Sequence, residues 1–339
     1  MNCDRTRREF LREALGLGLA CSVPSILSGG IRAEALWAAE AAALPEPKVI
    51  LSRNDSFLDG NGKANGALVR MAVEDGVMRI TGASTAPEAW STLFKPNEKV
   101  GIKLNCLGKK SFSPHIELVE AIVDGLKSAG VKDYNIVLFE RTSRELKEAG
   151  FKIRKSGGLK CFGTDALAGG GYEPQPQTAG SVGSCFSRIA SRFCDTIINV
   201  PILKDHDLSG VSVAMKNYYG IIHNPNKYHD NNCDPYIAEL NTHPYIRNKS
   251  RLIVCDALVA QYNGGPAFKR QWSWPFGGIL MSRDPVAMDR VGANIIEEER
   301  KAAGLPSLEQ AKREPKYIRT AARLGLGEGD PKKIELVVT

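Results

Sequence analysis

The chain has 339 residues, of which 43% are hydrophobic, and it carries a formal net charge of +7 at pH 7. This hydrophobic content is sufficient for a folded core and excludes an intrinsically disordered protein. The positive charge is spread along the chain and forms no basic stripe interleaved with aromatic residues. Nucleic acid is therefore excluded as a partner, and a small anionic ligand is the partner that the charge would suit.

Residues 1–43 are predicted to be a twin-arginine signal peptide and linker. Arg7 and Arg8 precede a Phe-Leu pair and a weakly apolar stretch at 14–27, which is the pattern of this export signal. An amphipathic basic helix is the alternative. The stretch contains two glycines and a proline, and it is shorter than the roughly 20 apolar residues that a stable membrane span needs. We expect the twin-arginine translocase as a partner during export and a periplasmic or other extracytoplasmic location.

Residues 44–339 are expected to form a single α/β domain in which strands and helices alternate. The expected elements, in chain order, are strand 48–51, helix 65–74, strand 99–104, a helix opened by Ser113 and Pro114, strand 135–139, strands 196–203, 251–255 and 278–282, a helix after Asp284 and Pro285, and an edge strand at 333–338. Alternation of this kind predicts three layers, with a mostly parallel sheet between helices on both faces. A glycine- and proline-containing stretch at about 151–190 is expected to be an irregular insertion.

The helix after the second strand has clear start and stop signals. Ser113 is expected to cap it, with the following proline in its first turn. Apolar residues at helical spacing should form its buried stripe, namely Ile116, Val119, Val123 and Leu126. The strands on either side of this helix would complete a right-handed βαβ unit, which requires the two strands to be parallel.

Polar residues follow five of the expected strands. They are Asn105 with Cys106, Glu140 with Arg141, Lys204 with His206, Asp256, and Asp284. The carboxyl ends of parallel strands share one edge of a sheet, where ligands usually bind. We therefore expect Asn105, Lys204, His206 and Asp256 to surround one hollow. Lys103 and Asn105 would share a strand face, and so would Lys204 and His206 if their strand continues.

Other residues near this edge have two interpretations each. Lys103 is either a site residue or a salt-bridge partner, because an unpaired buried lysine is costly. Lys216 and Asn217 stand among apolar residues, which favours a buried, directed placement over a surface turn. Gly264 and Gly265 either form a tight turn or allow the backbone to approach a ligand closely.

The side chains of four residues carry donor atoms of the kinds that bind transition metals, so a transition metal is the expected cofactor. These residues are His223, His229, Cys233 and Asp256. Their spacing matches no compact metal signature, and local turn structure is the alternative for His229 and Cys233. Export of folded protein favours a metal or redox cofactor. No C-x-x-C pair occurs, so no iron–sulfur cluster is expected within this chain. The cysteines between 161 and 194 could form a disulfide or remain free thiols.

Five segments together resemble the family known as domain of unknown function 362. They are residues 100–105, 199–206, 214–220, 264–266 and 282–289, and the resemblance covers about 100–296. The family has no general assigned activity, and some members are associated with iron–sulfur ferredoxin modules. The resemblance thus implies a ferredoxin-like redox subunit as a partner, since this chain itself lacks the ferredoxin cysteine pattern.

The leading hypothesis is an exported enzyme, either an oxidoreductase or a metal-dependent enzyme, that acts on a small anionic substrate. Lys204 and Lys216 would hold a carboxylate or phosphate, and Asn105 with Asn217 would orient the substrate. His206 would act as a neutral base or ligand, because two nearby ammonium groups should lower its proton affinity. The alternatives are a non-catalytic periplasmic protein that binds a ligand or cofactor, and a redox component that receives electrons from a neighbouring subunit.

Overall fold

The computed structural model of the protein describes residues 45–339, so the predicted signal segment lies outside the described residues. Within this part an eleven-stranded mixed sheet forms the framework. Along its main path the strands are β13 (Glu335–Val338), β1 (Lys48–Arg53), β12 (Gly278–Ser282), β10 (Ser250–Gln261), β7 (Thr196–Val200), β2 (Val100–Leu104), β3 (Ile136–Phe139) and β4 (Lys160–Cys161). Off this path, β8 (Ile202–His206) and β11 (Ser273–Trp274) pair with β10, and β9 (Gly210–Ser212) pairs with β8.

The sheet is mostly parallel, as predicted. Strands β4, β3, β2, β7 and β10 form one continuous parallel run, to which β8 adds in parallel along β10. Antiparallel pairs join β12 to both of its neighbours, β11 to β10 and β9 to β8.

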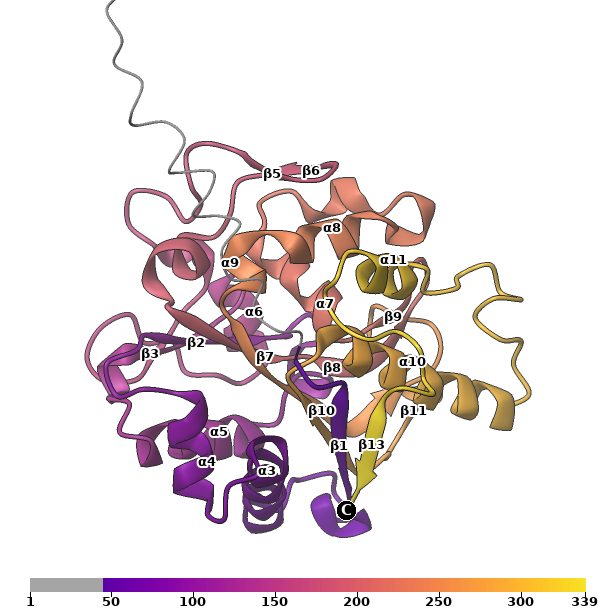
Figure 1. Ribbon diagram of the computed structural model, residues 1–339, viewed down its shortest axis with the longest axis horizontal. Coiled ribbons are helices and arrows are strands. Elements are labelled where there is room, and N and C mark those ends of the chain that lie inside the picture. The colour runs from indigo at the N-terminus through magenta and orange to yellow at the C-terminus, as the bar shows by residue number, and fades with distance from the viewer. Residues whose placement is uncertain (1–44) are drawn as a thin grey trace, which may run out of the picture. The chain divides into compact units, whose positions relative to one another are not determined.

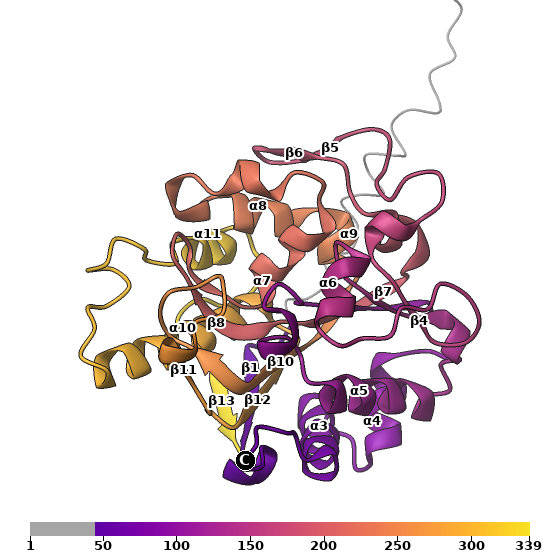
Figure 2. The ribbon, with the colours of Figure 1, turned by 180° about the vertical axis from the view of Figure 1, so that it is seen from behind.

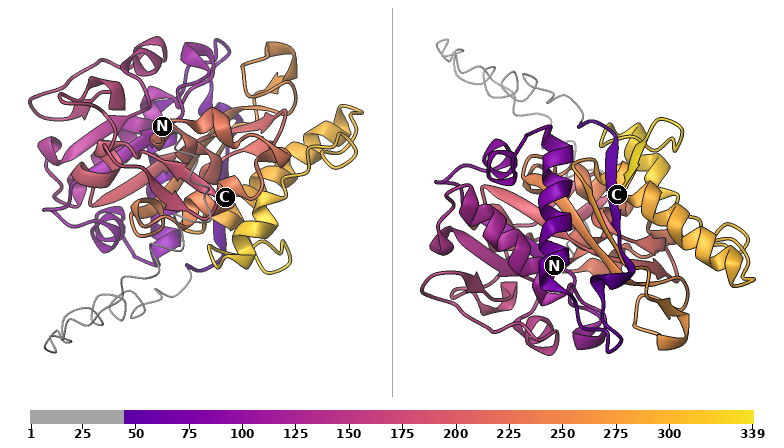
Figure 3. Two further views of the ribbon diagram at one scale, coloured as in Figure 1. Left: turned by 90° about the horizontal axis from the view of Figure 1, so that it is seen from above. Right: turned by 90° about the horizontal axis from the view of Figure 1, so that it is seen from below.

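Helices cover both faces, so the predicted three-layer α/β class is confirmed. Helices α3 (Gly66–Thr81), α4 (Ala86–Leu93) and α5 (Ile116–Ser128) pack together on one side, and α8 (Tyr236–Thr242), α9 (Pro244–Arg247) and α11 (Tyr317–Arg323) lie on the other (Figure 1). Figure 3 shows α3 crossing the lower face. Neighbouring residues of β7 point into two separate hydrophobic clusters, with Ile197 in one and Ile198 in the other, because side chains alternate along a strand.

Three further helices of the described residues pack against the sheet. Helix α6 (Ser143–Glu148) follows β3, and the long α10 (Pro285–Ala302) follows β12. The single turn α7 (Ala214–Asn217) packs on β7 and β9 (Figure 2). The stretch predicted as an irregular insertion contributes β4 to the sheet edge and a small hairpin of β5 (Gln177–Ala179) and β6 (Val182–Ser184). None of the helices in residues 45–339 is both long and apolar enough to cross a membrane.

The direction of β12 corrects one prediction. Because β12 runs antiparallel to β10, Asp284 lies at the opposite edge of the sheet from Asn105 and Lys204. Its carboxylate instead caps α10, accepting hydrogen bonds from the amides of Val286 and Ala287 at 2.8 and 2.9 Å. Two strands differ most from their predicted bounds. Strand 196–203 is divided into β7 and β8, and β10 continues to residue 261, which places Asp256 inside the strand.

The start of α5 also differs from the prediction. The helix begins at Ile116 with His115 as its cap residue, and the hydroxyl of Ser113 donates to the carbonyl of Lys109 at 2.6 Å instead of capping. Of the four residues predicted as a buried stripe, Val119, Val123 and Leu126 are buried, but Ile116 is 41% exposed. Ile116 lines a cavity at the start of the helix.

The cysteines of the described region are all free. Five of the six are buried, and Cys185 is partly exposed. The disulfide considered for the region between residues 161 and 194 does not form, which leaves the free-thiol interpretation. Burial raises the pKa of Cys194 to about 12, so this thiol is unreactive near neutral pH.

Candidate functional site

A cavity of about 220 Å³ lies beyond the carboxyl ends of β2 and β3 and along β8. Five of the residues predicted for catalysis or substrate binding line it, namely Asn105, Lys204, His206, Lys216 and Asn217, and so does His229, one of the predicted metal ligands. They come from the segment after β2, from alternate positions of β8 and from α7. The predicted continuation of the strand beyond Leu203 is confirmed, and Lys204 and His206 therefore share one face of β8.

Asn217 and Asn105 form the centre of a buried hydrogen-bond chain. The amide oxygen of Asn217 accepts from the amide nitrogen of Asn105 at 3.2 Å, and its own nitrogen donates to Asn199 at 2.7 Å. The amide oxygen of Asn105 accepts from the ammonium group of Lys204 at 3.1 Å. Because these partners use the polar atoms of both amides, the two asparagines hold Lys204 in place more than they offer contacts to a ligand.

Lys103 forms a buried salt bridge, which is one of its two predicted roles. Its ammonium group lies 2.9 Å from the carboxylate of Glu140, and the side chains are 0% and 8% exposed. The same group donates to the carbonyl of Leu104 at 2.6 Å. Lys103 is therefore neutralised beneath the cavity and does not add to the charge that a ligand would meet.

Lys204 is different because no carboxylate in the described residues lies within 4 Å of it. The residue is 1% exposed. Besides Asn105, its ammonium group has only the carbonyl of Pro266 at 3.5 Å and the ring of Phe112, whose centroid is 5.9 Å away. Burial lowers the pKa of Lys204 to about 8, so the group is mostly protonated at pH 7.

Lys216 is a second buried ammonium group without a carboxylate partner in the described part of the chain. It is 6% exposed. Its nitrogen lies 3.1 Å from the Nε2 atom of His229, 3.9 Å from the sulfur of Cys233 and 4.1 Å from the ring centroid of Tyr219. Burial lowers the pKa of Lys216 to about 8. The cavity therefore holds two ammonium groups that have no carboxylate within 4 Å in the described residues, and Glu140, Arg141 and Glu145 also line its wall.

The hydrogen bonds of His229 assign its tautomer. Its Nδ1 atom lies 3.1 Å from the carbonyl oxygen of Pro225, which can only accept, so Nδ1 carries the proton. The Nε2 atom then has a free lone pair and accepts from Lys216. Burial, and next the charge of Lys216, lowers the pKa of His229. His229 is thus a neutral imidazole whose basic nitrogen lines the cavity.

His206 has the opposite tautomer. Its Nδ1 atom accepts from the backbone amides of Leu208 and Ser209 at 3.1 and 3.3 Å. Asp207 approaches the same nitrogen at 3.0 Å, but its side chain is 61% exposed and can turn toward solvent. Burial, and next the charge of Lys216, lowers the pKa of His206 to about 2. The ring is neutral, as expected, but its remaining nitrogen carries a proton. In this tautomer His206 is a hydrogen-bond donor, which argues against the predicted role as a base.

The four predicted metal ligands do not come together. His229 and Cys233 both lie near Lys216, whereas His223 stacks edge-to-face on Tyr172 with ring centroids 5.1 Å apart. Asp256 lies inside β10, and its carboxylate is held by His115. Within residues 45–339 no group of three or more His, Cys, Asp or Glu side chains could hold a metal ion. These residues therefore do not fit the predicted metal site.

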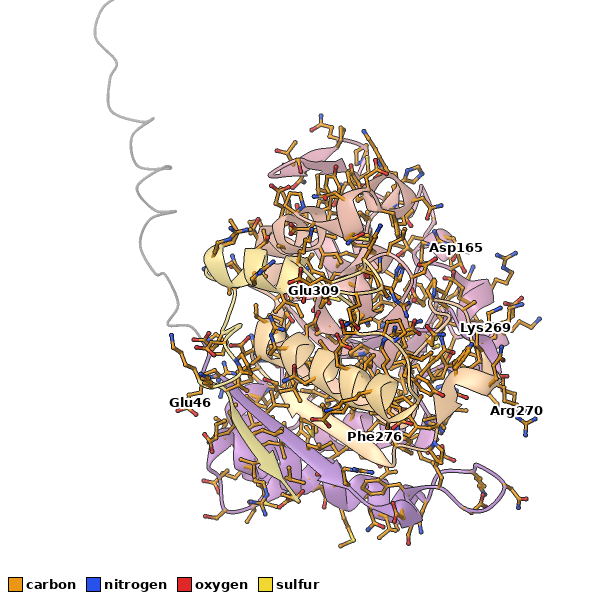
Figure 4. All side chains as sticks on the ribbon, turned by 90° about the vertical axis from the view of Figure 1, so that its right-hand side faces the viewer. Glu46, Asp165, Lys269, Arg270, Phe276 and Glu309 are labelled. Atoms are coloured by element: carbon orange, nitrogen blue, oxygen red, sulfur yellow. The ribbon has the colours of Figure 1, made fainter. Side chains whose placement is uncertain are left out.

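Gly264 and Gly265 do not line the cavity, and the close approach that Gly265 allows is to another part of the protein. The amide of Gly265 donates to the buried carboxylate of Asp205 at 2.9 Å, and a Cβ atom at Gly265 would collide with the backbone oxygen of Asp205. The glycine is thus required for close packing within the protein. Further along this loop, Lys269 and Arg270 are exposed and point outward (Figure 4), so they do not contribute to the cavity.

Asp289 positions the site from α10, a role that the sequence did not reveal. Its carboxylate accepts from the amides of Ala214 and Met215 at 2.7 and 3.3 Å and from the hydroxyl of Tyr317 at 2.9 Å. These bonds fix the start of α7, which carries Lys216. Burial raises the pKa of Asp289 to about 7.

Comparisons with known proteins place the chain in a family. The family model described as "Domain of unknown function (DUF362)" matches residues 100–294, and no curated protein matches in sequence. Among solved structures, a protein from Thermotoga maritima is similar with a TM-score of 0.44 and 10% identity over 74% of this chain and 60% of its own. The lactate racemase apoprotein from Thermoanaerobacterium thermosaccharolyticum has a TM-score of 0.44 and 14% identity over 75% and 59%. The chain thus spans about 60% of the length of these two proteins. Because the family model matches more than half of its residues, the chain belongs to the domain of unknown function 362 family.

Proposed function

We propose that the cavity binds a small molecule with a carboxylate or phosphate group and that the protein is an enzyme which transfers a proton to or from this molecule. One observation carries the proposal. Lys204 and Lys216 are buried ammonium groups that line the same cavity and have no carboxylate within 4 Å in the described residues. An unpaired buried charge costs several kcal/mol, and an anionic ligand would remove this cost.

The two histidines beside the lysines supply a donor and an acceptor. Their ring centroids are 5.6 Å apart. His206 would donate a hydrogen bond from Nε2 to an oxygen of the ligand. Lys216 would turn from Nε2 of His229 to the anionic group of the ligand, which frees this nitrogen to accept a proton as the general base. Lys216 contacts His229 and would stabilise negative charge that develops on the ligand. Because the predicted metal ligands do not come together, we assign the imidazole ring of His229 as the direct proton acceptor.

Proton transfer can be tested by hydrogen–deuterium exchange. In D₂O the protein is expected to exchange the C–H proton next to the carboxylate in one of a panel of small hydroxy- and keto-carboxylates, observed by ¹H NMR. His229→Gln should reduce the exchange rate at least about a hundredfold, which is a typical contribution of a general base, and should still bind phosphate through the lysines.

The matched control for this experiment is His223→Gln, because His223 is an exposed histidine outside the cavity. This variant should exchange at the wild-type rate. Binding of the carboxylates without exchange by the wild-type protein would favour the non-catalytic binding protein instead. Exchange that persists undiminished in His229→Gln would contradict the assigned base.

We also propose that residues 1–43 direct export by the twin-arginine route. The support is the pair Arg7 and Arg8 before an apolar stretch. Fused to a folded fluorescent protein in a bacterium, this segment should deliver fluorescence to the periplasm, and Arg7→Lys with Arg8→Lys should keep it in the cytoplasm. The lysine variant retains both charges, so equal export of the two fusions would contradict the twin-arginine assignment.

A further inference from the structure

A second cavity, of about 360 Å³, lies at the start of α5 beside β8 and β10. Most of its wall is apolar and is formed by Phe112, Pro114, Ile116, Ile202 and Val259. Residues 110–117 form one side, and Ala149 and Gly150, which follow α6, form another. This cavity is larger than the one that holds the lysines, and the proposed function does not use it.

One imidazole in this wall is oriented by a buried carboxylate. The Nδ1 atom of His115 lies 2.8 Å from Asp256, and the same carboxylate accepts from the backbone amides of His115 and Leu258 at 2.7 and 3.1 Å. Asp256 is fully buried, whereas the His115 side chain is 21% exposed. The carboxylate, by its charge, raises the pKa of His115.

The hydrogen bond to Asp256 leaves Nε2 of His115 as the free ring nitrogen. A carboxylate can only accept, so Nδ1 is the donor and Nε2 has a lone pair in the neutral ring. No described residue forms a hydrogen bond with this atom. Asp256 already holds α5 through the backbone amide of His115, so anchoring the helix does not require the ring. A histidine whose orientation is fixed by a carboxylate is the arrangement by which proteins present a base.

The ring of Phe112 separates the two cavities. Ile202 lines the second cavity, and Lys204, two residues further on the same face of β8, lines the first. Phe112 is 3% exposed, lines the second cavity and lies 5.9 Å from the nitrogen of Lys204. The second cavity is therefore a separate space, and its polar lining residues are His115, Lys110, Glu117, Ser111 and Ser113.

We propose that the second cavity is a binding site for a small apolar molecule that carries one acidic hydroxyl group, such as a phenol or a carboxylic acid. The apolar wall would contact the body of the molecule, and Nε2 of His115 would accept or share the proton of the hydroxyl group. A carboxylic acid would transfer its proton to His115 and remain as a carboxylate beside the imidazolium ion. A phenol would keep its proton and donate a hydrogen bond to the neutral ring.

Histidine NMR with phenol and benzoate as probes tests this proposal. The chain contains five histidines, so their ¹⁵N signals can be assigned by single substitutions. Phenol and benzoate should each shift the Nε2 signal of His115, and benzoate should also raise the pKa of this histidine. His115→Gln should weaken binding of both probes at least about tenfold, the loss expected for one hydrogen bond that involves a charged or acidic group.

The control separates this site from the lysine cavity. His115→Gln should bind phosphate as the wild type does, and the double variant Lys204→Met with Lys216→Met should bind phenol as the wild type does. Diethyl pyrocarbonate provides a test without any variant, because it acylates the free Nε2 of histidine and phenol should protect His115 from it. Unchanged His115 signals with both probes, or no protection by phenol, would overturn the proposal, and so would competition between phenol and phosphate.

Discussion

Replacing both Lys204 and Lys216 by methionine is expected to weaken phosphate binding at least about a hundredfold. Each ammonium group would supply a charge-assisted hydrogen bond worth about 1.5–3 kcal/mol, and 1.4 kcal/mol corresponds to about a factor of ten in affinity. The unfolding free energy at pH 7 should change little, because methionine removes buried charges that have no carboxylate partner in the described residues, which offsets the loss of the hydrogen bond to Asn105. Calorimetric titration with phosphate and unfolding in urea measure the two effects.

Two other lysines provide controls. Lys227→Met changes an exposed lysine close in the chain to His229 but outside the cavity wall, and it should alter neither affinity nor stability. Lys103→Met should cost about 3–5 kcal/mol of unfolding free energy, because it leaves Glu140 buried without its cation. Undiminished phosphate affinity in the Lys204 and Lys216 double variant would rule out the lysine pair as the anion site.

A rise in pH is expected to have opposite effects on phosphate affinity and on the unfolding free energy of the ligand-free protein. Burial lowers the pKa of both Lys204 and Lys216 from 10.5 to about 8. Between these two pH values the unfolded chain binds more protons than the folded one, so the unfolding free energy of the ligand-free protein should rise with pH. Phosphate affinity should fall above about pH 8, because the ammonium groups lose their protons. The double methionine variant should lack both slopes.

Local signals in the sequence predicted most elements but not the direction of every strand. The Asp284–Pro285 pair marks the start of α10, and the apolar spacing marks α5, because caps and periodicity are properties of adjacent residues. Strand β12 is five residues long and buried throughout. A short, fully buried strand has no sequence pattern that distinguishes a parallel from an antiparallel orientation. Its antiparallel pairing depends on the path of residues 262–277, which no local pattern determines.

Part of the membership of the candidate site was predictable, but Asp256 does not line the cavity, and the proton positions were not predictable. Lys204 and His206 follow from their place at a strand end, whereas the tautomer of His206 depends on how the backbone turns at Ser209. The pairing of His115 with Asp256 joins residues 141 positions apart. Contacts of this range depend on the assembled fold, and a single sequence has no pattern that reports them.

Asp289→Ala is expected to destabilise the protein by about 3 kcal/mol. The substitution leaves two backbone amides of α7 and the hydroxyl of Tyr317 without their acceptor in a fully buried place, and each unsatisfied group costs about 1–3 kcal/mol. Asp289→Asn should cost less, since its amide oxygen can still accept from Ala214. Glu298→Ala, an exposed position on the same helix, is the matched control and should stay within about 0.5 kcal/mol of the wild type.

The same carboxylate should make stability depend on pH. Burial raises the pKa of Asp289 from 3.8 to about 7, so between these values the folded state binds more protons than the unfolded chain. The contribution of this group to the unfolding free energy is therefore greatest at low pH and falls as the pH rises toward 7. Asp289→Asn cannot titrate and should remove this slope in urea unfolding.

Since Asp289 holds the turn that carries Lys216, Asp289→Ala should also weaken phosphate binding. Wild-type phosphate affinity in a folded Asp289→Ala variant would show that α7 keeps its place without the carboxylate.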